Sequence, residues 1–314
     1  MHEFQLIKKF FSKLARKNKG SLNLNDDVFF DKSKKLVVSI DTYVEGVHFI
    51  DFNEPDLVIK KIIRSSLSDI ICKGVKPKYY LISGSGNKKS FSLNNLKKIS
   101  KSLNQEQKKF NVFLCGGDTV YSDKLSFTVT SFGFSPKIIF RNKAELDDDI
   151  YVTGNLGDSF AGLYILKKKI NVSNSLSKYF KNKYYLPNLQ YELSNKLLKF
   201  ANTSIDISDG LIADLEKLIN KQKLSYRLFL DNIPISKNLK KILTQKKLSK
   251  LSYISQGDDY QILFTAKSSK SRIINKTAKS LGIKISKIGK ICSNLQKSQI
   301  IDQKGNKIAI KTKG

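Results

Sequence analysis

The chain has 314 residues, a formal net charge of +30, 40% apolar residues and 27% charged residues. This length suffices for two domains of ordinary size, and the apolar share is typical of a globular protein with a sizeable core. Because no run of about eighteen apolar residues occurs, we expect no membrane span. Three widely spaced cysteines and no recognisable signal peptide predict a cytoplasmic protein. Only two histidines occur, which excludes a zinc enzyme with several histidine ligands.

The positive charge does not by itself predict a nucleic-acid-binding protein. Only five of the 57 basic residues are arginine, the side chain whose bidentate fork nucleic-acid readers favour. The lysines are spread over almost the whole chain instead of forming one stripe, which indicates a solvated surface. We therefore do not expect nucleic acid as a partner, and a lysine-rich nucleic-acid-binding protein stays as the weaker alternative to an enzyme.

In the first half of the chain, apolar residues at helical spacing predict an amphipathic helix over 2–18, docked on the domain through its Phe and Leu side chains. Runs rich in β-branched and aromatic residues then predict strands at 35–41, 79–83, 112–115 and 126–134. Helices are predicted between them at 55–72 and 93–110.

The second half repeats this mixture after a polar segment at 141–149, whose aspartates Asp147 to Asp149 are expected to form a solvated turn. We place a domain boundary there, with domains at 1–140 and 141–314. Strands and helices alternate without a strict βαβ rhythm, which favours an α+β fold. Strands are predicted at 150–153, 226–230, 261–266 and 283–291, and helices at 159–168, 189–200, 211–221 and 271–281.

The acidic residues recur in six short motifs that also carry Gly, Ser, Thr or Asn, at 25–27, 39–42, 67–69, 116–119, 206–210 and 257–260. Several follow β-rich runs, so we expect them at strand ends. Carboxylates that converge from several strand ends form a hard-oxygen site for Mg²⁺, and Mg²⁺ usually accompanies phosphate. A capped turn would explain any single motif, but it explains six together less well.

Two of these motifs are the most informative. Gly116-Gly117-Asp118 follows an apolar strand and could bring backbone N–H groups and a metal ligand to a phosphate, although a Gly-Gly-Asp hairpin turn is an equal alternative. In the segment 204–211, Asp206 and Ser208 are expected to share one face of a strand, with Asp209 beside the turn that starts a helix. Asp214, one turn into that helix, is expected to be exposed or to lie behind the ligands. No Walker phosphate-binding loop occurs.

The ordered set of motifs resembles the thiamine-monophosphate kinase family, in the superfamily of aminoimidazole ribonucleotide synthetase. The segment Val44-Glu45-Gly46-Val47-His48-Phe49 is the most specific part of the match. The resemblance implies direct transfer of the γ-phosphoryl group of ATP to thiamine monophosphate, with several Mg²⁺ ions between the phosphates. It also implies two mixed α/β domains, an N-terminal ATP- and metal-binding sheet that packs in a homodimer, and a C-terminal α/β sandwich.

The resemblance also implies a role for each matching residue, and no catalytic residue beyond the metal cluster, because the acceptor is already an ionised phosphate. The implied metal ligands are Asp27, Ser39, Asp41, Asp69, Asp118, Asp206 and Asp209. The implied ATP contacts are Gly117, Asp118, Arg141 and Ser208. The implied contacts to thiamine monophosphate are His48 and Asp258.

The chain departs from the family at Asn25, Ile40 and Asp258, where the family has Gly, Thr and Glu. It also stops at Lys313-Gly314, where the family continues with an aromatic tail that helps to enclose the thiamine rings. These departures keep open another ATP-using enzyme of the superfamily, either a purine-pathway synthetase or a hydrogenase-maturation protein. Because packed carboxylates repel one another, we expect the site to be poorly ordered without metal.

Overall fold

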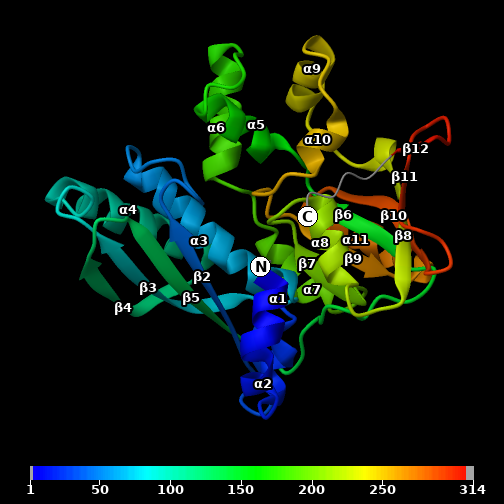
Figure 1. Ribbon diagram of the computed structural model, residues 1–314, viewed down its shortest axis with the longest axis horizontal. Coiled ribbons are helices and arrows are strands. Elements are labelled where there is room, and N and C mark those ends of the chain that lie inside the picture. The colour runs from blue at the N-terminus through cyan, green and yellow to red at the C-terminus, as the bar shows by residue number, and fades with distance from the viewer. Residues whose placement is uncertain (1–2, 309–314) are drawn as a thin grey trace.

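The computed structural model describes residues 3–308, which form two β-sheets flanked by helices (Figure 1). The five-stranded first sheet is built from residues 29–134, and the seven-stranded second sheet from residues 149–308. This is the predicted two-domain α+β arrangement. The Lys313-Gly314 end lies outside the described residues. No helix of residues 3–308 is both long and apolar enough to cross a membrane.

The first sheet has the strand order β1-β2-β5-β3-β4, and all neighbours are antiparallel except the parallel pair β3 and β4. Its strands are β1 (Phe29–Asp31), β2 (Leu36–Val44), β3 (Pro77–Gly86), β4 (Phe113–Tyr121) and β5 (Ser126–Phe134). Helices α3 (Pro55–Cys72) and α4 (Leu93–Phe110) begin and end at the predicted residues. Helix α3 packs on β2 and β5, and α4 packs against α3.

Within residues 3–308, no helix covers the other face of the first sheet. All nine residues of β4 are exposed. Three apolar side chains that the strand register places on this face, Ile40, Val120 and Phe134, are 65%, 50% and 53% exposed. Monomeric proteins rarely leave such a set of large apolar side chains in water, so this face is suited to contact with another protein surface.

The second sheet has the order β12-β11-β8-β10-β6-β9-β7, in which only β8 and β11 are parallel. Its strands are β6 (Asp149–Thr153), β7 (Thr203–Asp206), β8 (Leu224–Phe229), β9 (Ile262–Ala266), β10 (Ile285–Ser293), β11 (Gln299–Ile301) and β12 (Lys307–Ile308). Its helices are α5 (Asp158–Leu166), α6 (Asn174–Tyr185), α7 (Ser194–Leu197), α8 (Leu211–Leu218), α9 (Lys237–Gln245), α10 (Lys250–Ile254) and α11 (Ser271–Leu281). In Figure 1, α5, α6, α9 and α10 stand above this sheet.

Some predicted helices are wrong in detail. Within the described residues, the N-terminal segment is helical from Glu3 to Ala15 and not as far as residue 18, as α1 (Glu3–Leu6), a π-helical turn (Ile7–Phe11) and α2 (Ser12–Ala15). Its Phe10, Phe11 and Leu14 are exposed instead of docked, Leu14 by 80%. In place of the single helix predicted at 189–200, the structure has a 3-10 turn (Tyr191–Leu193) followed by α7. The apolar residues of this segment pack at irregular spacing around Phe110 and Phe264.

The aspartates at the boundary between the halves are mostly buried, so the predicted solvated turn is wrong for two of the three. Asp148 and Asp149 are each 1% exposed. The Asp148 carboxylate accepts hydrogen bonds from the Asn202 amide, the Thr265 hydroxyl and the Glu145 N–H. These donors compensate the carboxylate for its lost water and explain how it can lie inside the protein.

Helix α3 is buried on both sides because it lies between the two sheets. It contacts β2 and β5 of the first sheet and also β7 and α6 of the second half. One apolar core runs through this junction, from Ile62 and Leu67 of the helix to Tyr184 and Phe264 of the second half. The Leu67-Ser68-Asp69 motif at the end of α3 is thereby held directly against β7.

Candidate functional site

Three carboxylates meet where the two halves of the chain join. Asp27 precedes β1, Asp69 lies in the last turn of α3, and Asp206 ends β7. Each offers an oxygen, and the three oxygens lie within 4.8 Å of one another. We call these residues the carboxylate triad. Clustered carboxylate oxygens at this spacing fit a hard divalent cation such as Mg²⁺.

The electrostatics of the carboxylate triad point the same way. Burial raises the pKa of Asp69 well above its ordinary value, and the charges of Asp41 and Asp206 raise it further. Burial and the charge of Asp214 raise the pKa of Asp206 to about 6, although a hydrogen bond from the Ser68 hydroxyl, 2.8 Å away, favours its ionised form. Ionised together, these groups repel one another, so a cation between them would be strongly stabilising.

Strand β2 adds two further predicted ligands beside the carboxylate triad. The Ser39 hydroxyl donates to Asp69 Oδ2 at 2.5 Å. Asp41 lies two residues farther along β2 and therefore on the same face. Burial raises the pKa of Asp41, while the Tyr43 hydroxyl, 3.3 Å from its Oδ2, favours the charged form. Five of the seven predicted metal ligands, the carboxylate triad with Ser39 and Asp41, are thus close together in space.

Arg141 also lies at the carboxylate triad, where the structure gives it protein partners. Its guanidinium pairs with both oxygens of Asp27, and its backbone N–H donates to Asp26 Oδ2 at 2.9 Å. Burial lowers the pKa of Arg141, whereas the surrounding carboxylates, Asp26 first, oppose that shift. The side chain can therefore exchange one anionic partner for another without entering a new environment.

Lys73 is a functional candidate that the sequence analysis missed. Its side chain is fully buried, with Nζ 2.7 Å from Asp26 Oδ1, 2.6 Å from Asp27 Oδ2 and 3.0 Å from the Ser204 carbonyl oxygen. Burial alone would lower the pKa of Lys73, but the charge of Asp26 and its other anionic neighbours raises it. No local pattern marks Lys73, because it is one of 52 lysines and the carboxylates that it contacts, Asp26 and Asp27, lie far away in sequence.

Asp214 holds the loop after β7 in place through hydrogen bonds. Its side chain is buried, so the first of the two placements expected from the sequence, an exposed one, is wrong. Its Oδ2 accepts hydrogen bonds from the N–H groups of Ser208, Asp209 and Gly210, at 3.0, 2.9 and 3.0 Å. Ser208 lies in this loop and not on β7, which ends at Asp206. The Asp209 side chain is 62% exposed and contacts Lys217.

A second polar cluster contains both residues predicted to contact the acceptor. Asp258 Oδ1 lies 2.9 Å from Lys61 Nζ, which in turn sits 3.6 Å from the ring centroid of Tyr184. His48 Nδ1 accepts the Val44 N–H at 3.0 Å, and its carbonyl accepts the Tyr184 hydroxyl at 3.3 Å. Burial lowers the pKa of His48, and the charge of Asp258 opposes this shift. Lys61, buried in α3, was missed by the sequence analysis.

Gly117 and Asp118 lie inside β4, so neither the expected strand end nor the hairpin turn is correct. A Cβ on Gly117 would sit 1.7 Å from the Ile82 carbonyl oxygen, so only glycine fits beside β3. Asp118 pairs in register with Ser83 and, across the sheet, with Thr42, the residue next to Asp41. Successive residues point to opposite faces, so Asp118 belongs to the uncovered face, about 14 Å and three strands from β2.

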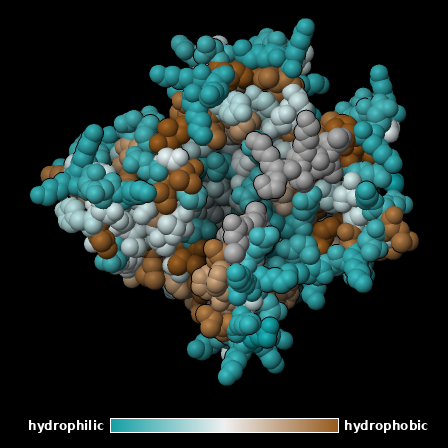
Figure 2. Space-filling view, in the orientation of Figure 1, coloured by the Kyte–Doolittle hydropathy of each residue, from teal (hydrophilic) through white to brown (hydrophobic). Residues whose placement is uncertain are grey.

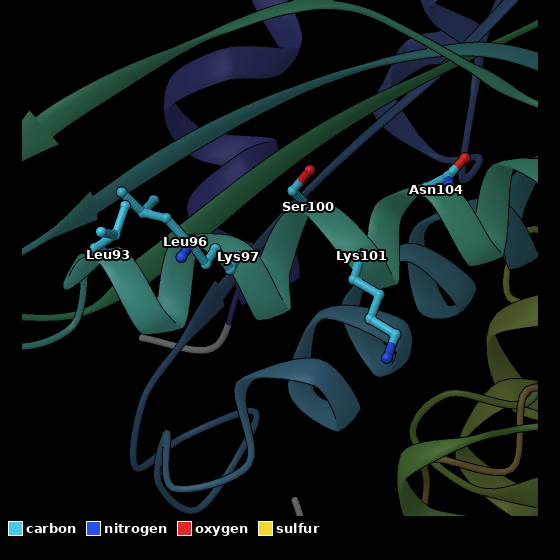
Figure 3. Close-up of a pocket in the computed structure, with 6 residues that line it drawn as sticks. All are labelled: Leu93, Leu96, Lys97, Ser100, Lys101 and Asn104. Atoms are coloured by element: carbon cyan, nitrogen blue, oxygen red, sulfur yellow. The ribbon is translucent and has the colours of Figure 1, made fainter.

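The surface between the two halves is hollowed and largely hydrophilic in the space-filling view (Figure 2). A separate pocket lies along α4 and contains none of the predicted site residues; Figure 3 shows the side chains that line it. Its lining residues are Leu93, Leu96, Lys97, Ser100, Lys101 and Asn104. The chemistry-bearing residues therefore lie between the halves and not at this pocket.

Comparison with known proteins agrees with the geometry. Residues 24–135 match the family of AIR synthase related protein, N-terminal domain. The chain is 34% identical to the thiamine-monophosphate kinase of Buchnera aphidicola subsp. Acyrthosiphon pisum, over 99% of this chain and 97% of that relative. It is 31% identical to the thiamine-monophosphate kinase of Haemophilus influenzae, over 93% of this chain and 89% of that relative.

A solved structure leads to the same family. The fold matches that of AaThiL complexed with AMPPCP and TMP, with a TM-score of 0.84 and 26% identity over 98% of this chain and 95% of that chain. The match extends over both sheets and the junction that holds the carboxylate triad. The chain therefore belongs to the thiamine-monophosphate kinase family.

Proposed function

We propose that this chain transfers the γ-phosphoryl group of ATP to thiamine monophosphate, giving thiamine diphosphate and ADP, with Mg²⁺ held at the carboxylate triad. The enzyme is a thiamine-phosphate kinase that uses ATP as co-substrate. The observation that carries the metal part is the meeting of Asp27, Asp69 and Asp206 at the junction of the two halves. Family membership favours this activity over the purine-pathway and hydrogenase-maturation alternatives.

The donor set fits Mg²⁺ because every candidate ligand offers oxygen. Asp27, Asp69 and Asp206 would hold the ion, with Ser39 and Asp41 beside them. When bound, Mg²⁺ neutralises phosphate charge and brings the two substrates together. We propose Asp209 as a further metal ligand because its side chain is exposed in the loop that follows Asp206. We propose Asp118 as a metal ligand as well, although it lies on the uncovered face of the first sheet, where a second copy of the chain would supply its neighbours.

The protein's own groups bind and orient the substrates. Asp214 holds the N–H groups of the Ser208 loop in place, so this loop meets ATP already ordered. The Arg141 guanidinium has the fork geometry for bidentate contact with phosphate in place of Asp27. At the acceptor side, His48 and Asp258 would contact thiamine monophosphate. Because the acceptor phosphate is already ionised, positioning does the work and no general base is required.

We further propose that the chain forms a homodimer through the uncovered face of the first sheet, with domains at 1–140 and 141–314. Ile40, Val120 and Phe134 supply the apolar contact, and Asp118 would be covered with them. We expect Ile40→Asp to convert the dimer to a monomer in size-exclusion chromatography with light scattering. Leu295→Asp, at a site 93% exposed and far from this face, is the control. A wild-type monomer would contradict the proposal.

The activity is tested by incubating the purified chain with ATP, MgCl₂ and thiamine monophosphate and separating the thiamine products chromatographically. We expect thiamine diphosphate to form with equimolar ADP, and to be absent when EDTA replaces MgCl₂. Unphosphorylated thiamine is the control acceptor. Hydrolysis of ATP without thiamine diphosphate, from a folded chain, would reject the kinase. We place the reaction in the cytoplasm, where Cys72, Cys115 and Cys292 would stay free thiols.

A further inference from the structure

Lys73 occupies the position of a bound cation at the edge of the carboxylate triad. It follows α3 directly, and its side chain is fully buried. An ammonium has three hydrogens to donate. Lys73 has three partners for them, Asp26 Oδ1, Asp27 Oδ2 and the Ser204 carbonyl oxygen, at 2.6–3.0 Å. This set of three oxygens from two chain segments resembles the environment that a small cation would have.

The number of charged groups around Lys73 shows which negative charges it neutralises. Five carboxylates, those of Asp26, Asp41 and the carboxylate triad, lie together at the junction. Lys73 and Arg141 bring two positive charges, and both are engaged with Asp26 and Asp27. Asp41, Asp69 and Asp206 have hydroxyl donors, from Tyr43, Ser39 and Ser68, and no such pairing with a cationic side chain in the described part of the chain. Three negative charges are therefore left for metal.

We infer that Lys73 is a built-in counter-ion that takes one cation position of this carboxylate cluster, so that the chain binds one fewer divalent cation than its carboxylates would otherwise hold. The inference rests on the proposed role of Mg²⁺. Lys73 holds Asp26 and Asp27 together without metal and directs Mg²⁺ toward Asp69 and Asp206. A lysine that only anchored the end of α3 would affect stability equally at every Mg²⁺ concentration.

The experiment compares wild type with Lys73→Met, using the full chain after EDTA treatment. Thermal unfolding is followed by circular dichroism across a MgCl₂ titration, and bound Mg²⁺ per chain is counted by equilibrium dialysis. We expect Lys73→Met to melt lower than wild type without metal and to gain more from Mg²⁺. It should bind one additional ion. Because one unit charge is uncovered close to a divalent cation, half-saturation should need about tenfold less Mg²⁺.

Lys287→Met is the matched control, because Lys287 Nζ also pairs with a buried carboxylate, that of Asp149, at 2.7 Å but away from the cluster. Its melting temperature should fall by the same amount at every Mg²⁺ concentration. If Lys73→Met does not fold, the double variant Asp26→Asn/Lys73→Met removes both charges. It should fold and bind the wild-type number of ions.

The outcomes separate this inference from the proposed function. If Lys73→Met binds no additional Mg²⁺ and gains no more stability than wild type, the counter-ion role is overturned. If the double variant binds more ions than wild type, the role is overturned as well. Failure of wild type alone to bind Mg²⁺, with binding in Lys73→Met, would reject the proposed metal site and support the role of Lys73. No binding in either chain rejects both.

Discussion

Replacing Asp206 by Asn should stabilise the metal-free protein while abolishing the kinase activity. Asp206 is buried at the end of β7, within the carboxylate triad and near the charge of Asp214. An asparagine has the same shape and keeps an oxygen to accept the Ser68 hydroxyl. It lacks the charge that the cluster must tolerate when no metal is bound. Function and stability should therefore change in opposite directions.

The magnitude follows from the pKa of Asp206. Burial and Asp214 raise that pKa from 3.8 to about 6, and this difference corresponds to about 3 kcal/mol. Below about pH 4 the carboxyl group is protonated in both states, so Asp and Asn chains should be equally stable. Between about pH 4 and pH 6 the unfolded chain releases its proton first. Wild type therefore loses stability as pH rises, and the advantage of Asn reaches about 3 kcal/mol by pH 8.

The assay is urea unfolding in EDTA, followed by circular dichroism at several values from pH 4 to pH 8. Asp209→Asn is the control, because the Asp209 side chain is exposed and contacts Lys217, so removing its charge should give no gain. Adding MgCl₂ should stabilise wild type more than Asp206→Asn. The reasoning is refuted if Asp206→Asn is no more stable than wild type at pH 8, or if its advantage is equal at pH 4 and pH 8.

Two further substitutions test the backbone around the site. Gly117→Ala should weaken nucleotide binding and lower the melting temperature, because the new Cβ would collide with the Ile82 carbonyl oxygen and separate β4 from β3. Calorimetric titration with AMPPCP measures the nucleotide affinity. An unchanged melting temperature would contradict the prediction. Asp214→Ala should cost about 2–4 kcal/mol in urea unfolding, because three loop N–H groups lose their acceptor. It should also raise the KM for ATP, and an unchanged KM would mean that this loop does not contact the nucleotide.

The helices that the sequence predicts best are the two longest, α3 and α4, each of 18 residues. The bounds of α3 and α4 match the prediction, since both combine helical spacing with a clear start and stop. Helices α6 and α9 were missed because their lysine-rich sequences look like solvated loops. Asp148 was misplaced for a related reason: the donors that bury it come from Asn202 and Thr265, far away in sequence.

The site shows the same division. Asp27, Asp69 and Asp206 could be predicted because their motifs carry a pattern that a single capped turn does not explain. Lys61 and Lys73 could not, because two lysines among 52 carry no local signal. Their burial against Asp258 and Asp26 depends on the packing of α3 between the sheets.

The sequence alone determined the chemical class of the site, because oxygen ligands, glycines and their order along the chain are local properties. Only the tertiary structure decided which acidic residues meet. Helix α3 joins Asp69 to Asp27 and Asp206, whereas strand register turns Asp118 to the opposite face of the sheet from Asp41. The tertiary structure also decided which cations balance the cluster. Charges act through space, so residues distant in sequence set the electrostatics of the site.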